Sequence, residues 1–228
     1  MTVLYVVSVF IGPDGSGGNP LGVFVEGAAI APKRRQAVAH DLNFSETVFV
    51  DSIDDGIATI RIHTPAAELP FAGHPTVGTA WLLRNLDIDL RTLRCVAGDV
   101  AAWQDGERAW IRASPEWVAG IPEPDQLRTP TEVDAFVPPA MGEPGHYVWA
   151  WDDETAGRVR ARFFPTHLGI AEDEATGAAA VLMGHGLGRS LTIRQGVGSE
   201  LLVRPTGDGR IEVGGRVELV EQRDYDPR

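Results

Sequence analysis

Cysteine is nearly absent from this sequence, which contains one such residue, Cys95. An internal disulfide, a cysteine-rich zinc site and a racemase mechanism with two opposed thiols all need more than one cysteine. All three are therefore excluded within a single chain. Because Cys95 lies in an apolar segment, we expect its thiol to be inert.

Long apolar runs and clusters of basic residues are also missing. No apolar run approaches the roughly 18 residues that span a bilayer, and the apolar N-terminal segment lacks a basic leader and a cleavage site. The net charge is −12, whereas binding to a phosphate backbone needs concentrated positive charge. We therefore expect no membrane segment, no nucleic-acid partner and a cytoplasmic location.

Patterns typical of metal or phosphate sites are absent as well. His63, His74 and His185 are too far apart in the sequence to form a recognisable zinc motif. The glycine-rich stretch at residues 15–22 lacks the Gly-Lys-Ser/Thr ending of a phosphate loop, and a hairpin loop is the simpler interpretation. We expect neither a metal nor a cofactor.

The residues that are present predict a globular α+β protein. Of the 228 residues, 43% are hydrophobic, which is ample for a packed core. Residues 57–63 alternate apolar and polar side chains, which favours an antiparallel sheet. Helices are expected from Pro32 to Asn43, from about Pro75, and from about Glu174 to Gly184. Strands are expected at residues 2–10, 22–25, 46–51, 57–63, 93–97, 109–113, 147–151, 159–164, 191–195, 201–204, 211–213 and 217–220.

The stretch from Thr64 to Ala80 organises the rest of the chain. Pro65 and Pro70 exclude a helix through its first part, and Gly73 allows a bend before the predicted helix. The first turn of a helix has unpaired N–H groups and the positive end of the helix dipole. This turn therefore favours an anion.

The chain contains a second stretch of similar pattern. HPTVGTAWLL at residues 74–83 and DEATGAAAVLM at residues 173–183 both continue through Thr and Gly into an apolar helix. The seven prolines of residues 114–145 indicate a linker or an irregular excursion between two halves. Two such helix starts facing one cleft would hold a small carboxylic acid between them.

Three residues are candidates for proton chemistry. Glu46 stands at the entrance of an apolar strand, where partial burial would raise its pKa and suit it to proton transfer; a solvated loop position is the alternative. His74 is either a cap or packing residue, or a proton shuttle and donor to a carboxylate. Asp173 precedes a helix, where capping is the ordinary explanation.

Four motifs together resemble the phenazine biosynthesis PhzF-like family. They are GGNPLGVF at residues 17–24, FSETVFV at 44–50, ELPFAGHPTVGTA at 68–80 and GIAEDEATGAAA at 169–180. The resemblance implies a diaminopimelate epimerase-like α+β fold with two pseudo-symmetric domains. Each domain would be a curved, mainly antiparallel sheet or barrel around a central helix, at residues 1–113 and 114–216. The last strand, residues 217–228, would return to the first domain.

The resemblance also implies a function. Family members of this kind are cofactor-independent isomerases of secondary metabolism, active as homodimers, that move a proton between carbons of a small unsaturated carboxylic or amino acid. Glu46 would be the general acid/base, with His74 and Asp173 beside it in the cleft between the domains. The expected substrate-binding residues are Asn19, Gly73, Pro75, Thr76, Thr176, Gly177 and Ala178.

The sequence departs from the family pattern at several positions. Glu174 stands where the family has Pro, Ala178 stands where it has Ser, and the family's GRPS segment is reduced to Gly198-Ser199-Glu200. These changes leave the natural substrate open. They also leave two alternatives open, an epimerase or other tailoring enzyme on the same scaffold and a binding protein without catalysis.

Overall fold

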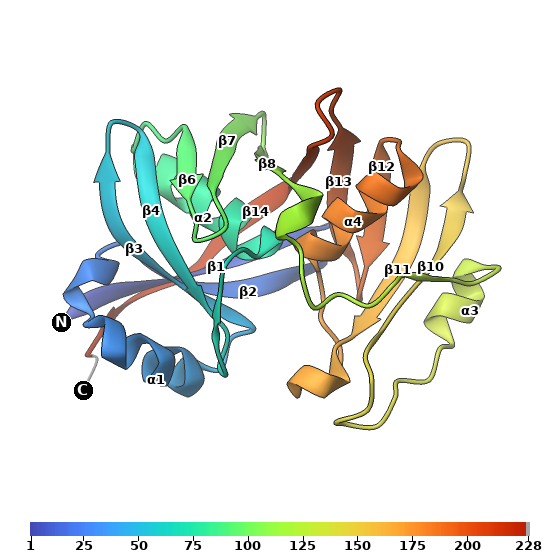
Figure 1. Cartoon of the computed structure of the whole chain (residues 1–228), viewed down its shortest axis with the longest axis horizontal. Coiled ribbons are helices and arrows are strands. Elements are labelled where there is room, and N and C mark those ends of the chain that lie inside the picture. The colour runs from blue at the N-terminus through green and yellow to red at the C-terminus, as the bar shows by residue number, and fades with distance from the viewer. Residues whose placement is uncertain (227–228) are drawn as a thin grey trace.

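The computed structural model describes residues 1–226. Its first half is a closed barrel around one helix, α2 (Gly73–Asn85) (Figure 1). The barrel closes because the last strand pairs with both the first strand and β8, so that no edge is left unpaired. Its strands are β1 (Thr2–Ile11), β2 (Gly17–Phe24), β3 (Glu46–Asp54), β4 (Ile57–His63), β6 (Thr92–Arg94), β7 (Asp99–Asp105), β8 (Arg108–Ala113) and β14 (Ile211–Tyr225).

Shorter elements complete this half. The helix α1 (Pro32–Leu42) begins at Pro32 and ends at Asn43, which adopts the left-handed conformation with φ 54°, as its sequence predicts. The short strand β5 (Glu68–Leu69) pairs with β4, and the 3₁₀ turn η1 (Gly27–Ala29) precedes α1. The segment after β5 then enters α2.

The second half is an open sheet with helices on both faces. From β14 the order continues through β13 (Ser199–Pro205), β12 (Leu191–Gln195), β11 (Arg158–Phe164), β10 (His146–Asp153) and β9 (Asp125–Gln126). The helix α4 (Gly177–Leu187) packs against β13 and β14. The helix α3 (Pro130–Asp134) covers the outer face of β10 and β11, where Val133 packs on Val148 and Phe164.

The strand β14 is continuous where the sequence predicted two strands. The predicted break coincides with Gly214 and Gly215, which remain in the strand. A Cβ atom on Gly214 would lie 2.3 Å from the Trp110 ring, and one on Gly215 would lie 2.5 Å from the Phe10 ring. The glycines therefore make room for two large aromatic side chains and do not end the strand.

Residues 114–145 form an irregular excursion that packs on the molecule. It contains the 3₁₀ turn η2 (Pro115–Trp117), β9 and α3. Trp117, Val118 and Ile121 pack against the main core, so this part of the segment is held by apolar burial and is not a free linker. The 3₁₀ turn η3 (Thr166–Leu168) follows β11 and leads to Asp173.

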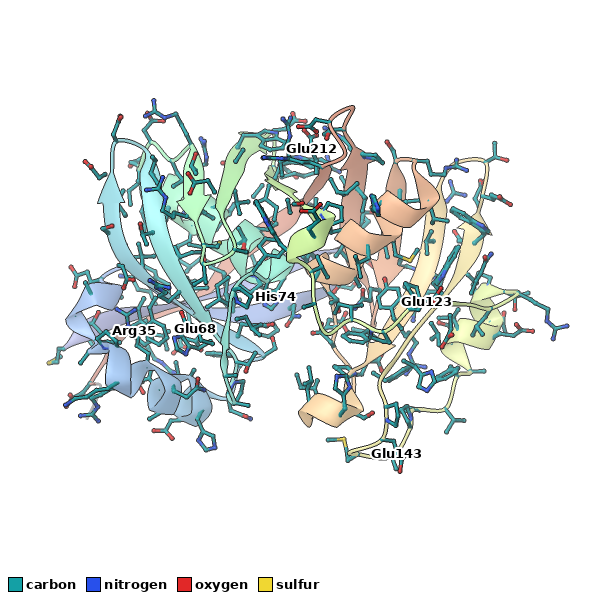
Figure 2. The ribbon with its side chains drawn as sticks, in the orientation of Figure 1. Arg35, Glu68, His74, Glu123, Glu143 and Glu212 are labelled. Carbon is teal, nitrogen blue, oxygen red and sulfur yellow. The ribbon has the colours of Figure 1, made fainter. Side chains whose placement is uncertain are left out.

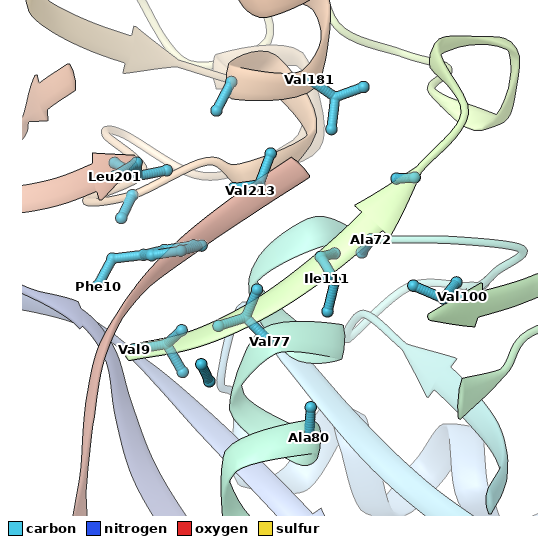
Figure 3. Close-up of a cluster of buried hydrophobic side chains, with 14 of the residues drawn as sticks. Val9, Phe10, Ala72, Val77, Ala80, Val100, Ile111, Val181, Leu201 and Val213 are labelled. Carbon is cyan, nitrogen blue, oxygen red and sulfur yellow. The ribbon is translucent and has the colours of Figure 1, made fainter. Parts of the chain in front are cut away.

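One hydrophobic core runs through both halves (Figure 3). Val9, Val77 and Ile111 of the first half belong to the same buried cluster as Val181 and Val213 near α4. The division into two domains remains a prediction, and β14 belongs to the sheets of both halves. Residues 227 and 228 of the predicted last strand lie outside the described residues. Within residues 1–226, no helix is both long and apolar enough to cross a membrane.

Candidate active site

The three candidate residues come from different parts of the fold and meet where the halves join. Glu46 is the first residue of β3, which lies parallel to β2, and His74 is the second residue of α2. Asp173 lies just before α4, and its N–H donates to the Phe163 carbonyl of β11 at 2.9 Å. Figure 2 labels His74 at the N-terminal end of α2, which contacts α4.

Glu46 and His74 face each other in a nearly dry environment. Nδ1 of His74 lies 3.4 Å from Oε2 of Glu46, and the two side chains are 4% and 16% exposed. Within residues 1–226, Oε2 of Glu46 has no hydrogen-bond partner, so this approach is not a hydrogen bond, and Nε2 of His74 is also buried without a partner. Buried polar atoms are rarely left unpaired, so these two atoms are suited to bind a small polar ligand.

Asp173 is held by donors from both halves. Nδ2 of Asn19, on β2, donates to Oδ1 of Asp173 at 2.7 Å and to the Ala175 carbonyl at 2.9 Å. The Thr176 hydroxyl donates to Oδ2 of Asp173, and the Ser45 hydroxyl donates to Oδ1 of Asn19 at 3.2 Å. The structure thus brings Asn19, Asp173 and Thr176 together, while the catalytic role expected of Asp173 and the substrate contacts expected of Asn19 and Thr176 remain predictions.

Burial dominates the electrostatics of the site. It raises the pKa of Glu46 to about 7, and it lowers the pKa of His74 to about 4. Burial and the charge of Glu46 raise the pKa of Asp173 to about 6, against the lowering effects of His74 and of its hydrogen bonds to Thr176 and Asn19. At neutral pH the imidazole is uncharged, Asp173 is mostly ionised and Glu46 is close to its midpoint.

The helix α2 begins earlier than predicted and α4 begins later. These shifts change which backbone N–H groups are available to a ligand. The helix α2 begins at Gly73, two residues before Pro75, and the Thr76 N–H already donates to the Ala72 carbonyl at 3.4 Å. The helix α4 begins at Gly177 and not at Glu174. Within residues 1–226, the N–H groups of Gly73, His74, Gly177 and Ala178 have no hydrogen-bond acceptor.

The expected substrate-binding residues differ in their placement. Gly73 and Gly177 lie in direct backbone contact, and Ala178 is half-buried in the first turn of α4. Pro75 and Thr76 lie in the first turn of α2, but the Thr76 hydroxyl donates to the Ala72 carbonyl of its own helix at 2.6 Å. The Thr76 side chain is therefore used within α2.

Four further polar residues near Asp173 were not predicted as site residues. Gln195 is fully buried at the end of β12, where alternation with Leu191 and Ile193 places it on the inner face. That polar residue at an apolar position was the available signal. The other three are Tyr147, Glu174 and Ser199, which hydrogen-bond to Gln195, to Val197 and to Gly18 respectively.

Two cavities on the described part of the chain lie away from this cluster. One cavity of about 420 Å³ lies beside Trp81 and Arg216, and another of about 390 Å³ lies beside Arg160 and Arg194. Neither is lined by Glu46, His74 or Asp173.

Comparison with known proteins is consistent across sequence and structure. The model of the phenazine biosynthesis-like protein family matches residues 7–116. A trans-2,3-dihydro-3-hydroxyanthranilate isomerase of Pseudomonas fluorescens is 30% identical, and the alignment covers 89% of each chain.

Two solved structures have the same fold. A putative phenazine biosynthesis PhzC/PhzF protein from Clostridium difficile has a TM-score of 0.80 at 20% identity, with 99% of this chain and 100% of that chain covered. A probable proline racemase from Agrobacterium radiobacter has a TM-score of 0.64 at 13% identity, with coverage of 99% and 93%. They confirm the predicted diaminopimelate epimerase-like α+β fold. The chain belongs to the phenazine biosynthesis-like protein family, and it is an enzyme of the isomerase class.

Proposed function

We propose that this enzyme moves a proton between two carbons of a small unsaturated carboxylic or amino acid, without a cofactor, and that Glu46 carries the proton. The observation that supports this proposal most directly is the burial of the Glu46 carboxyl beside the His74 ring. A carboxyl with a pKa raised to about 7 is half ionised at neutral pH, which suits a group that must both accept and return a proton.

The proposed reaction conserves charge and protons. The Glu46 carboxylate takes a proton from a carbon that is acidified by a neighbouring double bond, and the electron pair moves along the unsaturated system. The new Glu46 carboxyl then delivers the same proton to the carbon at the far end. Glu46 returns to its ionised state, so neither an oxidant nor a metal is part of the balance.

The neighbours of Glu46 would bind and orient the substrate. Asp173 accepts hydrogen bonds and suits an amino or hydroxyl group, whereas the uncharged His74 ring presents an unpaired Nε2. The free N–H groups of Gly73, His74, Gly177 and Ala178 suit a carboxylate and the negative charge that develops during transfer. These N–H groups replace those that we expected after Pro75 and Glu174.

A thiol-based epimerase is the less supported alternative. Burial raises the pKa of Cys95 to about 12, so its thiol would not supply a thiolate base at neutral pH. An epimerase that uses one carboxylate base on the same scaffold remains compatible with the site. The expected homodimer is also a proposal, which the molar mass in solution would test.

The substrate is best identified among relatives of the compound named for the Pseudomonas fluorescens enzyme. The protein is incubated in heavy water with trans-2,3-dihydro-3-hydroxyanthranilate and a panel of unsaturated amino acids, while conversion is followed by absorbance and deuterium by mass. We expect conversion of at least one compound by the natural protein and by Glu116→Gln, an exposed control. Conversion should be lost in Glu46→Gln, which should still bind the compound.

Two results would contradict the proposal. Conversion at the natural rate by Glu46→Gln would remove Glu46 from the reaction. Binding without conversion of any compound by the natural protein would favour a binding protein over an isomerase of this kind.

A further inference from the structure

A buried chain of hydrogen bonds lies behind Asp173. The Tyr147 hydroxyl, on β10, donates to Oε1 of Gln195 at 3.4 Å, and Nε2 of Gln195 lies 2.9 Å from Oγ1 of Thr176. The Thr176 hydroxyl in turn contacts Oδ2 of Asp173. Tyr147 and Gln195 are fully buried and Thr176 is 8% exposed, so the chain is shielded from bulk water.

The direction of this chain is fixed by one backbone group. Nε2 of Gln195 also lies 2.9 Å from the Asp173 carbonyl oxygen, which is only an acceptor. A flipped Gln195 amide would set two carbonyl oxygens against each other, so the NH₂ group must face Asp173 and Thr176. The Thr176 oxygen therefore receives an N–H, and its own proton is directed to Oδ2 of Asp173.

The other oxygen of Asp173, Oδ1, also receives a donor whose orientation is fixed by a backbone carbonyl. Nδ2 of Asn19 donates to Oδ1 of Asp173, and its other hydrogen bond goes to the Ala175 carbonyl, which is again only an acceptor. The Ser45 hydroxyl donates to the remaining Oδ1 of Asn19. Both Asp173 oxygens thus receive donors whose orientations are set elsewhere in the fold.

We propose that Gln195, supported by Tyr147, is a positioning residue that orients the Thr176 hydroxyl and thereby keeps Asp173 an ionised hydrogen-bond acceptor. Each Asp173 oxygen accepts one such donor, and both hydrogen bonds are stronger to the ionised carboxylate than to the neutral carboxyl. The titratable groups that face Asp173 are Glu46 from β3, the uncharged His74 from α2 and the neutral Tyr147 from β10. Burial and Glu46 oppose ionisation, and the oriented donors counteract them.

The inference deepens the proposed function and rests on it for its catalytic meaning. If Asp173 keeps its charge, two neighbouring carboxyl groups divide the work, because the like charge of Asp173 disfavours ionisation of Glu46. Glu46 is then the group that holds a proton near neutral pH. Asp173 supplies an acceptor for an amino or hydroxyl group of the substrate.

The test measures the titration of Asp173 directly in the full-length protein without substrate. Aspartate side chains carry a ¹³C label at the carboxyl carbon, and the Asp173 signal is assigned by its loss in Asp173→Asn. We expect Thr176→Val and Gln195→Met to raise the Asp173 midpoint by about one pH unit or more, because each removes or releases a donor to an ionised group. Tyr147→Phe should raise it by less.

The chain offers matched controls for these variants. Tyr5→Phe and Tyr225→Phe remove the same hydroxyl from the two other tyrosines, which lie outside this chain of hydrogen bonds, and should leave the midpoint unchanged. Tyr147→Phe and Thr176→Val preserve shape closely, so they decide the question if Gln195→Met does not fold. An unchanged midpoint in folded Thr176→Val and Tyr147→Phe would overturn the proposal.

The outcome is separable from that of the proposed function. A raised midpoint in a protein that converts no substrate would leave the positioning role standing and remove the isomerase mechanism. An unchanged Asp173 midpoint in a protein whose conversion depends on Glu46 would overturn the positioning role and leave the isomerase mechanism standing.

Discussion

Gly73 and Gly177, the first residues of α2 and α4, are in backbone contact. A Cβ atom built on Gly73 would lie 2.5 Å from the carbonyl carbon of Gly177. A Cβ atom built on Gly177 would lie 2.8 Å from the backbone nitrogen of His74. Real side chains essentially never approach a backbone atom so closely. Only glycine at both positions therefore lets the two helix N-termini meet beside Glu46 and Asp173.

This contact predicts that Gly73→Ala and Gly177→Ala destabilise the protein. Since the clash is with backbone, the two helices must separate, and we expect a loss of about 1–3 kcal/mol in the free energy of unfolding. Urea unfolding followed by tryptophan fluorescence measures it. Gly186→Ala, also in α4 but with nothing within 4 Å of the added Cβ, is the control and should be neutral or gain up to about 1 kcal/mol. Equal effects at all three glycines would refute the argument.

The buried Glu46 carboxyl predicts a stability that depends on pH. Its pKa rises from 4.5 to about 7 on folding, so the folded state favours the protonated form. This preference is fully present below pH 4.5 and is lost as the pH rises through 7. Glu46→Gln should therefore be more stable than the natural protein at pH 8, by up to about 3 kcal/mol. The difference should shrink toward pH 4.5; thermal unfolding at several pH values would reveal a constant difference if this were wrong.

The activity should also depend on pH. If Glu46 must be ionised to accept the first proton, kcat/KM should fall tenfold per pH unit below about pH 7, and more steeply below about pH 6, where Asp173 also gains a proton. His74, with a pKa lowered to about 4, should add no titration step between pH 5 and 8. Initial rates from pH 5 to 9 on the compound that the enzyme converts would measure this profile. A flat profile across pH 7 would exclude Glu46 as the titrating base.

Glu174 should stabilise the closed arrangement of the two halves. Its carboxylate accepts the Val197 N–H at 3.0 Å and the Ser199 hydroxyl at 2.9 Å, and Oγ of Ser199 accepts the Gly18 N–H at 2.7 Å. Glu174→Ala should lower the free energy of unfolding by about 1–2 kcal/mol, because these donors lose their acceptor. Glu200→Ala, which breaks no side-chain hydrogen bond or ion pair of the described residues, is the control. Equal losses in both variants would show that Glu174 has no special role.

The sequence alone determined the features that depend on neighbouring residues. Pro32 and Asn43 marked the two ends of α1, because proline fits the first helical position and asparagine tolerates the left-handed conformation that ends a helix. The alternation of residues 57–63 located β4 to the residue. The motifs around Glu46, His74 and Asp173 identified the family, because each motif consists of residues that are adjacent in the sequence and can be recognised without the fold.

The tertiary structure decided everything that depends on residues far apart in the chain. The barrel of the first half closes through the pairing of β14 with β1. The two glycines within β14 predicted a break in the strand, whereas in the structure they make room for the Trp110 and Phe10 rings. The orientation of Gln195 depends on a carbonyl from another segment. The raised pKa values of Glu46 and Asp173 follow from burial and, for Asp173, from the charge of Glu46, which act only after β3, α2 and α4 have been brought together.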